Sequence, residues 1–134
     1  MKILGIDYGT VRIGLAVGDT EVLLAFPIGT VQNIDGVIAT IVEKAKEEGV
    51  SRIVLGVPRR LSGEDEKGET EEHVDHFLKG LREKTDIEID TEDERLTTVI
   101  AERRRMDTGT KKKKFDLDSE AAVVLLETYM QRIV

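Results

Sequence analysis

The fold is decided by Lys2-Ile-Leu-Gly-Ile-Asp7, which is followed by Tyr8-Gly9-Thr10 and then by Ile13-Gly-Leu-Ala-Val-Gly18. The first run is short and mostly apolar, so it predicts a central β-strand. Gly9 permits a tight turn because glycine adopts a positive φ without steric cost. Since this connection is too short for a crossover, the second run predicts a strand antiparallel to the first.

The same patterns locate the remaining elements. Phe26 to Val31 predicts a third strand, in which Pro27 indicates a sheet edge or a strand start. Apolar residues from Ile34 to Ala45 recur at helical spacing, and Gly49 ends that helix. The other predicted elements are strands over 51–56 and 87–93, helices over 69–84, 98–106 and 117–133, and a basic loop over 107–114.

This order, βββαβαβαα, predicts one α/β domain over residues 1–134. Three strands are joined by tight turns, and two more are added through helical crossovers. The expected result is a mixed five-stranded sheet with strand order 3-2-1-4-5, flanked by helices. That arrangement is the RNase H-like topology.

The composition excludes several classes of protein. The chain has no cysteine, which excludes a disulfide framework, a thiol nucleophile and a cysteine-ligated zinc or iron–sulfur site. No apolar run approaches the roughly 20 residues needed to cross a bilayer. The apolar start ends at Asp7, too soon for a signal peptide. We expect a cytoplasmic protein without a membrane partner.

The charge distribution is uneven. The net charge is −7, yet the segment from Arg95 to Lys114 has eight basic and two acidic residues, so it carries +6 and the rest carries −13. A basic strip on an acidic body can steer a polyanion such as nucleic acid. The alternative interpretation is a solvated helix face and loop.

Carboxylates follow two of the predicted strands. Asp7 ends an apolar strand, where burying a carboxylate costs free energy unless it is paired or bound to a metal ion. The alternative is that the Asp7 side chain caps the tight turn that follows. Asp93 and Glu94 end the fifth strand. Because the carboxyl ends of parallel strands open on one side of a sheet, these acids should face the same crevice as Asp7. The alternative is that they are solvated residues leading into a helix.

A third acidic position is the start of the last predicted helix, at Asp116 and Asp118. Capping and the helix dipole would by themselves explain an Asp there. Three acids from two strands and a helix nevertheless form a set of hard oxygen ligands, which suits Mg²⁺ or Mn²⁺ better than Zn²⁺. Two such ions can promote phosphodiester cleavage.

Two further motifs leave alternatives open. His73 and His76 lie three residues apart on a predicted helix, so they could form a transition-metal site with neighbouring acids or be solvated surface histidines. Arg59 and Arg60 follow Gly56-Val-Pro58 and could reach a phosphate or pair with nearby acids.

Four ordered segments resemble the YqgF/RuvX family along the whole chain. They are Gly5 to Asp19, Val54 to Pro58 with Gly63, Asp93 to Thr98, and Lys111 to Lys114 with Leu117 to Ala122. The resemblance implies an RNase H-like fold related to Holliday-junction resolvases. It also implies a metal-dependent nuclease that matures the 5′ end of 16S ribosomal RNA.

The resemblance implies that Asp7, Glu94 and Asp118 are the catalytic, metal-binding acids, with Asp93 as a rival to Glu94. We expect nucleic acid to be contacted by a set of basic residues: Arg12, Arg59, Arg95, Arg103, Arg104, Lys111, Lys112, Lys113 and Lys114. Relatives usually carry an apolar residue and Asn where this chain has Arg59 and Arg60.

Other functions remain as alternatives. The partner could be branched DNA, cut by a Holliday-junction-type resolvase, in place of an rRNA precursor. The protein could also be a non-catalytic RNA-binding factor in ribosome assembly, although clustered carboxylates would bring no gain in binding phosphates. A phosphotransferase of the actin and sugar-kinase type needs a duplicated domain, and this chain has one copy. We expect a monomer or a homodimer.

Overall fold

The computed structural model describes residues 1–58, 69–93 and 114–134. Within these ranges the elements are β1 (Lys2–Asp7), β2 (Arg12–Asp19), β3 (Leu24–Gln32), α1 (Val37–Glu48), β4 (Arg52–Val57), α2 (Glu69–Lys84), β5 (Glu88–Asp93) and α4 (Lys114–Ile133). The helix expected over 98–106 lies outside the described residues.

The five strands form one sheet in the order β3-β2-β1-β4-β5. β1 pairs with β2 antiparallel and with β4 parallel, and β4 pairs with β5 parallel. This confirms the predicted RNase H-like topology. Pro27 lies in β3, which is an edge strand as the prediction allowed. An edge strand pairs on one side only, so it accommodates a residue without an N–H more readily than a central strand does.

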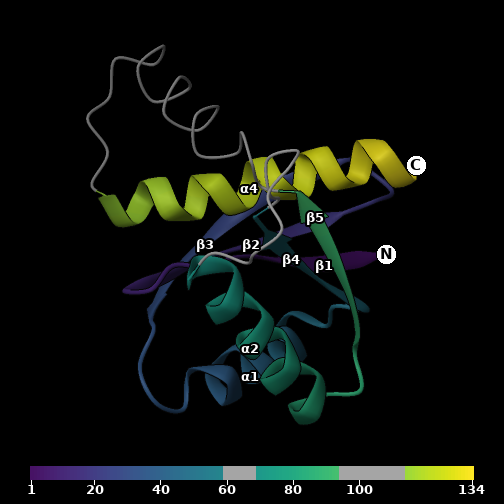
Figure 1. Cartoon of the computed structure of the whole chain (residues 1–134). Helices are drawn as coiled ribbons and strands as arrows, with labels where there is room; N and C mark the ends of the chain where they lie inside the picture. The colour runs from purple at the N-terminus through teal and green to yellow at the C-terminus, as the bar shows by residue number, and fades with distance from the viewer. Residues whose placement is uncertain (59–68, 94–113) are drawn as a thin grey trace, which may run out of the picture.

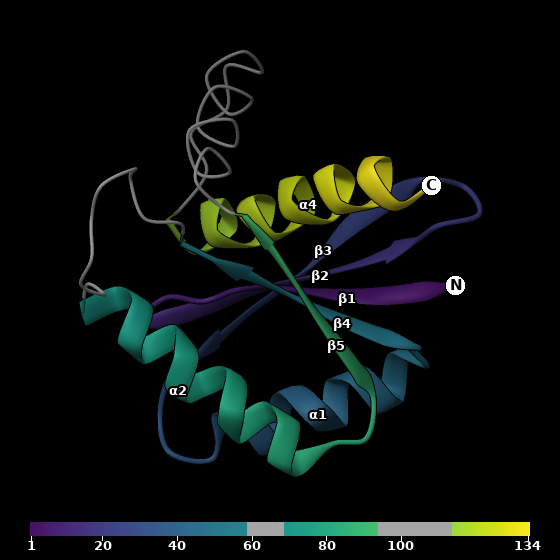
Figure 2. The same cartoon turned by 45° about the vertical axis from the view of Figure 1, so that its right-hand side comes forward.

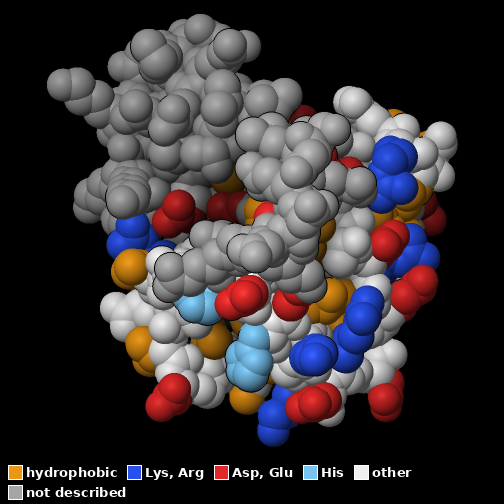
Figure 3. Space-filling view, in the orientation of Figure 1, with side chains coloured by type: hydrophobic (Ala, Val, Ile, Leu, Met, Phe, Trp, Pro, Cys, Tyr) orange, Lys and Arg blue, Asp and Glu red, His pale blue; other side chains and the backbone are white. Residues whose placement is uncertain are grey.

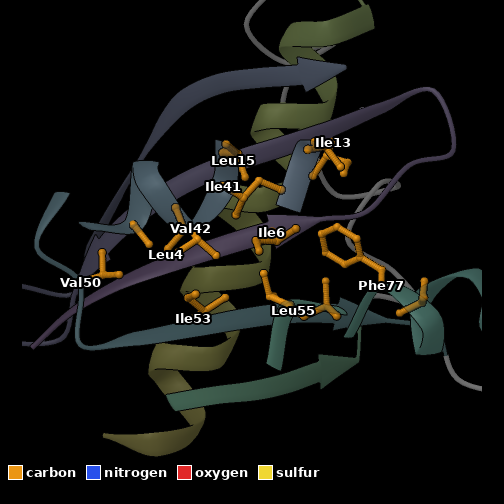
Figure 4. Packing of buried hydrophobic residues seen from close by; sticks show 14 residues of the cluster. Leu4, Ile6, Ile13, Leu15, Ile41, Val42, Val50, Ile53, Leu55 and Phe77 are labelled. Atoms are coloured by element: carbon orange, nitrogen blue, oxygen red, sulfur yellow. The ribbon is translucent and has the colours of Figure 1, made fainter. Parts of the chain in front are cut away.

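The sheet lies between two helical layers, with α1 and α2 on one face and α4 on the other (Figures 1 and 2). Alternate residues of β1 and β4 enter different cores: Leu4 and Ile53 pack toward α1 and α2, whereas Ile3 and Val54 pack toward α4. Figure 4 shows the larger cluster, in which Phe77 of α2 points toward the strands. Burial on both faces explains why these strands read as continuous apolar runs.

The β2–β3 pair contains a register shift between Leu15 and Ala16, since Leu15 pairs with Gly29 and Ala16 with Pro27. Gly29 has φ 108°, a conformation that side chains other than glycine rarely adopt. Its N–H donates to the Oγ of Ser119 in α4, at 3.3 Å. The bulge therefore redirects a backbone donor from the edge strand onto the helix.

Two helix boundaries differ from the prediction. α1 begins at Val37 because Gly36 has φ 87°, and Ile34 is 63% exposed outside the helix. α4 begins at Lys114, whereas the prediction placed its start at residue 117 and Lys114 in a loop. Apolar periodicity does not mark the hydrogen-bonded start of a helix, so it missed this first turn. Among the described residues, none of the helices is long and apolar enough to cross a membrane.

A buried tyrosine fastens α4 to the far edge of the sheet. The hydroxyl of Tyr129 accepts a hydrogen bond from Arg52 Nη1 and donates one to Asp90 Oδ2, both at 2.8 Å. Nearby, Arg132 Nε donates to Glu92 Oε2 at 2.9 Å, and its guanidinium lies 5.2 Å from the centre of the Tyr129 ring. Burial by itself would raise the pKa of Asp90. Hydrogen bonds from Tyr129 and from the Thr91 N–H outweigh this effect. The positive charges of Arg132 and Arg52 act in the same direction, so the pKa of Asp90 lies below its usual value.

Tyr129→Phe should lower the free energy of unfolding by about 1–3 kcal/mol at pH 7, since both partners of a buried hydroxyl lose it. The pKa of Asp90 is lower in the folded state than in the unfolded state. The ionised Asp90 therefore contributes fully to stability above its unfolded pKa of about 3.9, and this contribution is lost as the pH falls through its pKa in the folded state. The difference between variant and wild type should therefore shrink in acid. Urea unfolding at several pH values tests this.

Thr128→Ala is the matched control, because Thr128 is exposed and its hydroxyl donates only to the carbonyl of Val124, one turn earlier in α4. It should leave stability within about 0.5 kcal/mol of wild type. Equal stability of Tyr129→Phe and Thr128→Ala would show that the network does not fasten α4.

Candidate active site

The strands that carry Asp7 and Asp93 end at one edge of the sheet. β1 ends at Asp7 and β5 ends at Asp93, whose partner in β4 is Val57. Since β1, β4 and β5 are parallel, their carboxyl ends meet at the same edge. The helices α2 and α4 begin on that side of the molecule too (Figure 2). The ends of β1 and β5 therefore share an edge, but the expectation that Asp7 and the acids after β5 face one crevice needs their faces as well.

Asp7 lies on the α4 face of this edge, next to the segment that carries Asp118. Its register partner in β2 is Gly14, and paired residues of antiparallel strands project to the same face. A Cβ at Gly14 would lie 2.1 Å from the carbonyl oxygen of Asp118. The fold therefore brings Asp7 and the backbone of Asp118 to the same face of the sheet, although they are 111 residues apart in the chain.

Asp118 forms an ion pair with Arg12, the first residue of β2. Arg12 Nε lies 3.2 Å from Asp118 Oδ2, and their side chains are 29% and 27% exposed. Asp118 is the fifth residue of α4, so the interpretation of this residue as a helix cap is wrong. Arg12, expected to contact nucleic acid, lies against a proposed metal ligand.

Ser119 is a positioning residue that the sequence did not reveal. It is 4% exposed, and its hydroxyl donates to the carbonyl of Leu15 at 3.0 Å while it accepts the Gly29 N–H. These bonds attach the residue after Asp118 to both β2 and β3. A serine among acidic and apolar helix residues has no distinctive spacing, so nothing in the sequence pointed to this contact.

Asp93 lies on the opposite face from Asp7. Ile89 of β5 packs in the α1/α2 core, whereas Asp90 and Glu92 contact Tyr129 and Arg132 of α4. Because strand residues alternate between faces, Asp93 shares the face of Ile89. This weighs against Asp93 as a co-ligand of Asp7. The rival ligand, Glu94, lies outside the described residues.

The described ranges hold no group of three His, Asp or Glu side chains arranged to bind a metal ion. That includes His73 and His76, so the described part of the chain gives the transition-metal alternative no support. Asp7 and Asp118 offer hard carboxylate oxygens, the type of ligand that Mg²⁺ and Mn²⁺ prefer. The third implied carboxylate belongs to Glu94, beyond these ranges.

Most of the expected nucleic-acid contacts fall outside the described part of the chain. They are Arg59, Arg95, Arg103, Arg104, Lys111, Lys112 and Lys113, together with the side chain of Lys114. Of the expected set, Arg12 is the one residue whose side chain the structure describes.

The solved structures most informative for the fold are resolvases. Thermus thermophilus RuvC in complex with a Holliday junction substrate superposes with a TM-score of 0.64 at 15% identity, covering 98% of this chain and 95% of that one. The fowlpox virus Holliday junction resolvase gives a TM-score of 0.60 at 11% identity, covering 99% and 100%. At these identities the likeness establishes the fold alone.

Relatives in sequence are much more similar. A protein of Maridesulfovibrio salexigens named "Putative pre-16S rRNA nuclease" is 38% identical, over 98% of this chain and 99% of its own length. A protein of the same name from Endomicrobium trichonymphae is 40% identical, over 96% and 94%. The family described as "RuvX: Holliday junction resolvase" matches residues 1–132. With four matching motifs in order and a RuvC-like fold, the chain belongs to the RuvX family.

Proposed function

We propose that this protein is a metal-dependent nuclease that hydrolyses phosphodiester bonds in structured RNA, in 5′-end maturation of pre-16S rRNA. One observation carries the proposal: the end of β1 sets Asp7 on the same face and edge as Asp118 of α4. Relatives at 38% and 40% identity that bear the name of a pre-16S rRNA nuclease support the choice of substrate.

In this proposal Asp7, Glu94 and Asp118 hold Mg²⁺ or Mn²⁺. When bound, a pair of such ions would activate water and stabilise the charge that develops on the phosphate and the leaving oxygen. Two carboxylates on one face of a rigid sheet edge suit this role, because hard divalent cations need several oxygen ligands.

The chain's own residues prepare this site. Arg12 holds the Asp118 carboxylate in one orientation through the 3.2 Å ion pair and offsets its charge beside Asp7. Ser119 fixes the helix position behind it. Rigid support of this kind matters because displacement of a catalytic group by about 1 Å can cost about 100-fold in rate.

Branched DNA is the second candidate substrate, favoured by the family's description as a Holliday junction resolvase. The discriminating assay uses a 5′-labelled pre-16S rRNA fragment and a four-way DNA junction, each with Mg²⁺, Mn²⁺ or EDTA. Mg²⁺-dependent cutting of the RNA is the expected result. Cutting of the junction alone would identify a resolvase, and tight RNA binding without cutting would identify an assembly factor.

Size-exclusion chromatography distinguishes monomer from homodimer.

Lys111, Lys112, Lys113 and Lys114 should contribute phosphate contacts, because a segment of charge +6 lies in sequence between Glu94 and Asp118. Replacing all four with glutamine should weaken RNA binding and reduce the slope of log Kd against log salt by up to about 3. Fluorescence anisotropy at several salt concentrations measures this slope. An unchanged slope would indicate a solvated segment without phosphate contacts.

A further inference from the structure

A cavity of about 490 Å³ opens beside the proposed active site, on the opposite face of the sheet. The residues of its lining used below are Tyr8, Asn33, Asp35, His73, His76 and Phe77. Its volume falls in the range of about 300–1,000 Å³ that is typical of small-ligand sites. Figure 3 shows the chain's two histidine side chains close together on this face, among apolar, acidic and basic side chains.

The topology places this cavity at the catalytic edge. β3 runs antiparallel to β2, which runs antiparallel to β1, so β3 and β1 end at the same edge. α1 follows β3 directly, and its first turn forms one wall. Tyr8, the residue after Asp7, forms part of another wall. The cavity and the end of β1 therefore lie at one edge of the sheet, on its two faces.

The cavity is also joined to the turn that follows Asp7. Asn33 Nδ2 donates to the carbonyl of Gly9 at 2.8 Å. The ring of Tyr8 packs against Phe77 of α2, with centroids 5.0 Å apart and planes tilted by 52°. Phe77 is 5% exposed, so this aromatic pair is anchored in the core. One hydrogen bond and one aromatic contact thus join the cavity wall to the turn after Asp7.

The lining suits a nucleobase better than a phosphate. His73 and His76 are exposed imidazoles, one helical turn apart on α2, and imidazole and tyrosine rings both stack on unpaired bases. Asp35 and Asn33 carry oxygens that can accept hydrogen bonds from base amino groups. Of the described lining, Lys84 is the one Lys or Arg and Asp35 is the one Asp or Glu, so these residues give the lining no excess of positive charge.

We propose that this cavity, the His73/His76 pocket, receives the base of one unpaired nucleotide of the RNA substrate beside the cleaved bond. This inference rests on the proposed nuclease function and adds a determinant of substrate choice. An RNA with a bulged or frayed nucleotide at this position would be bound more tightly than a continuous duplex. The pocket would thus direct the enzyme to structured RNA with a local single-stranded defect.

The chain contains only two histidines, which makes their imidazole resonances specific reporters. The Asp7→Asn protein, used to prevent cleavage, is titrated with an RNA duplex that carries one bulged nucleotide. Long-range ¹H–¹⁵N spectra should show saturable shifts of both imidazoles. A duplex with an abasic site at the bulge should leave them unshifted. The proposal that the pocket binds a base would be overturned if the imidazoles did not shift, or if the abasic duplex shifted them equally. It would also be overturned if the imidazoles responded to Zn²⁺ and not to RNA.

Two independent changes should weaken binding of the bulged RNA about tenfold, the size of a lost base stack. They are the double change His73→Ala with His76→Ala, and Ala39→Trp, which places an indole in the first turn of α1 where Ala39 lines the cavity. Binding of the abasic duplex should be unaltered.

The control variants are Lys79→Ala on α2 and Glu47→Trp on α1, both at exposed positions outside this lining. They should bind both RNAs as wild type does, and circular dichroism should match across all variants. The two proposals can fail separately. If the imidazoles of the Asp7→Asn protein do not shift while the wild-type protein cuts RNA, only the pocket is refuted. Persistent shifts with an Asp7→Asn protein that still cuts refute only the assignment of Asp7.

Discussion

Asp7→Asn should reduce cleavage by at least about 10³-fold, equivalent to about 4 kcal/mol in the barrier, and leave the fold intact. The substitution preserves shape but removes the charge that would attract a divalent cation. Asp7 lies at the carboxyl end of β1, on the face where the segment that carries Asp118 packs. Single-turnover cleavage of the labelled RNA measures the effect, with circular dichroism as the test of folding.

Asp93→Asn is the matched control, because Asp93 ends a strand at the same edge but shares the face of Ile89. It should change the rate by less than about threefold, and Glu94→Gln should reduce it far more. If Asp93→Asn proved the more damaging of these two, the ligand would be Asp93. Near wild-type cleavage by Asp7→Asn would instead show that Asp7 has a structural role in the turn.

Gly14→Ala should have the second largest effect, on both stability and cleavage. The added methyl carbon would lie 2.1 Å from the carbonyl oxygen and 2.4 Å from the carbonyl carbon of Asp118. Both are backbone atoms, so no side-chain rotation relieves the clash, and α4 must move away from β2. Overpacking of this kind costs typically about 1–3 kcal/mol and occasionally more. Displacement of Asp118 should lower the cleavage rate about 100-fold.

Gly18→Ala provides the comparison on the same strand and face. Its added carbon would lie 3.2 Å from the flexible end of Met130 and 3.3 Å from the Leu24 carbonyl oxygen, so a small adjustment suffices. Thermal melts and cleavage rates of the two variants should therefore differ clearly. If Gly14→Ala matched Gly18→Ala in both, close approach of α4 to β2 would not be what positions Asp118.

The sheet could be predicted because its determinants are local. Short apolar runs, one glycine turn and two helical spacings specify which strands pair and in which direction, and all five strands were found in the predicted order. Helix ends were predicted less well, as α1 and α4 show, since apolar periodicity reports packing and not the first hydrogen-bonded turn. Asp7 was recognisable because a carboxylate after a buried strand is unusual.

The site depended on contacts that no local pattern encodes. Arg12 and Asp118 are 106 residues apart, and Ser119 and Leu15 are 104 apart. These pairs meet only because α4 docks on β2 at a particular height and rotation, which Gly14 permits by lacking a side chain. In the same way, His73 and His76 became part of a cavity once α2 packed beside the first turn of α1.

By itself, the sequence determined the fold class, the strand order and the strand end that carries Asp7, since each follows from spacing within a few residues. Only the tertiary structure decided that Asp118 pairs with Arg12, that Asp93 faces away from Asp7, and that the two histidines line a cavity. The physical reason is that these outcomes depend on how helices dock against the sheet. That docking is set by the combined packing of many side chains, and a shift of one helical residue would change every contact.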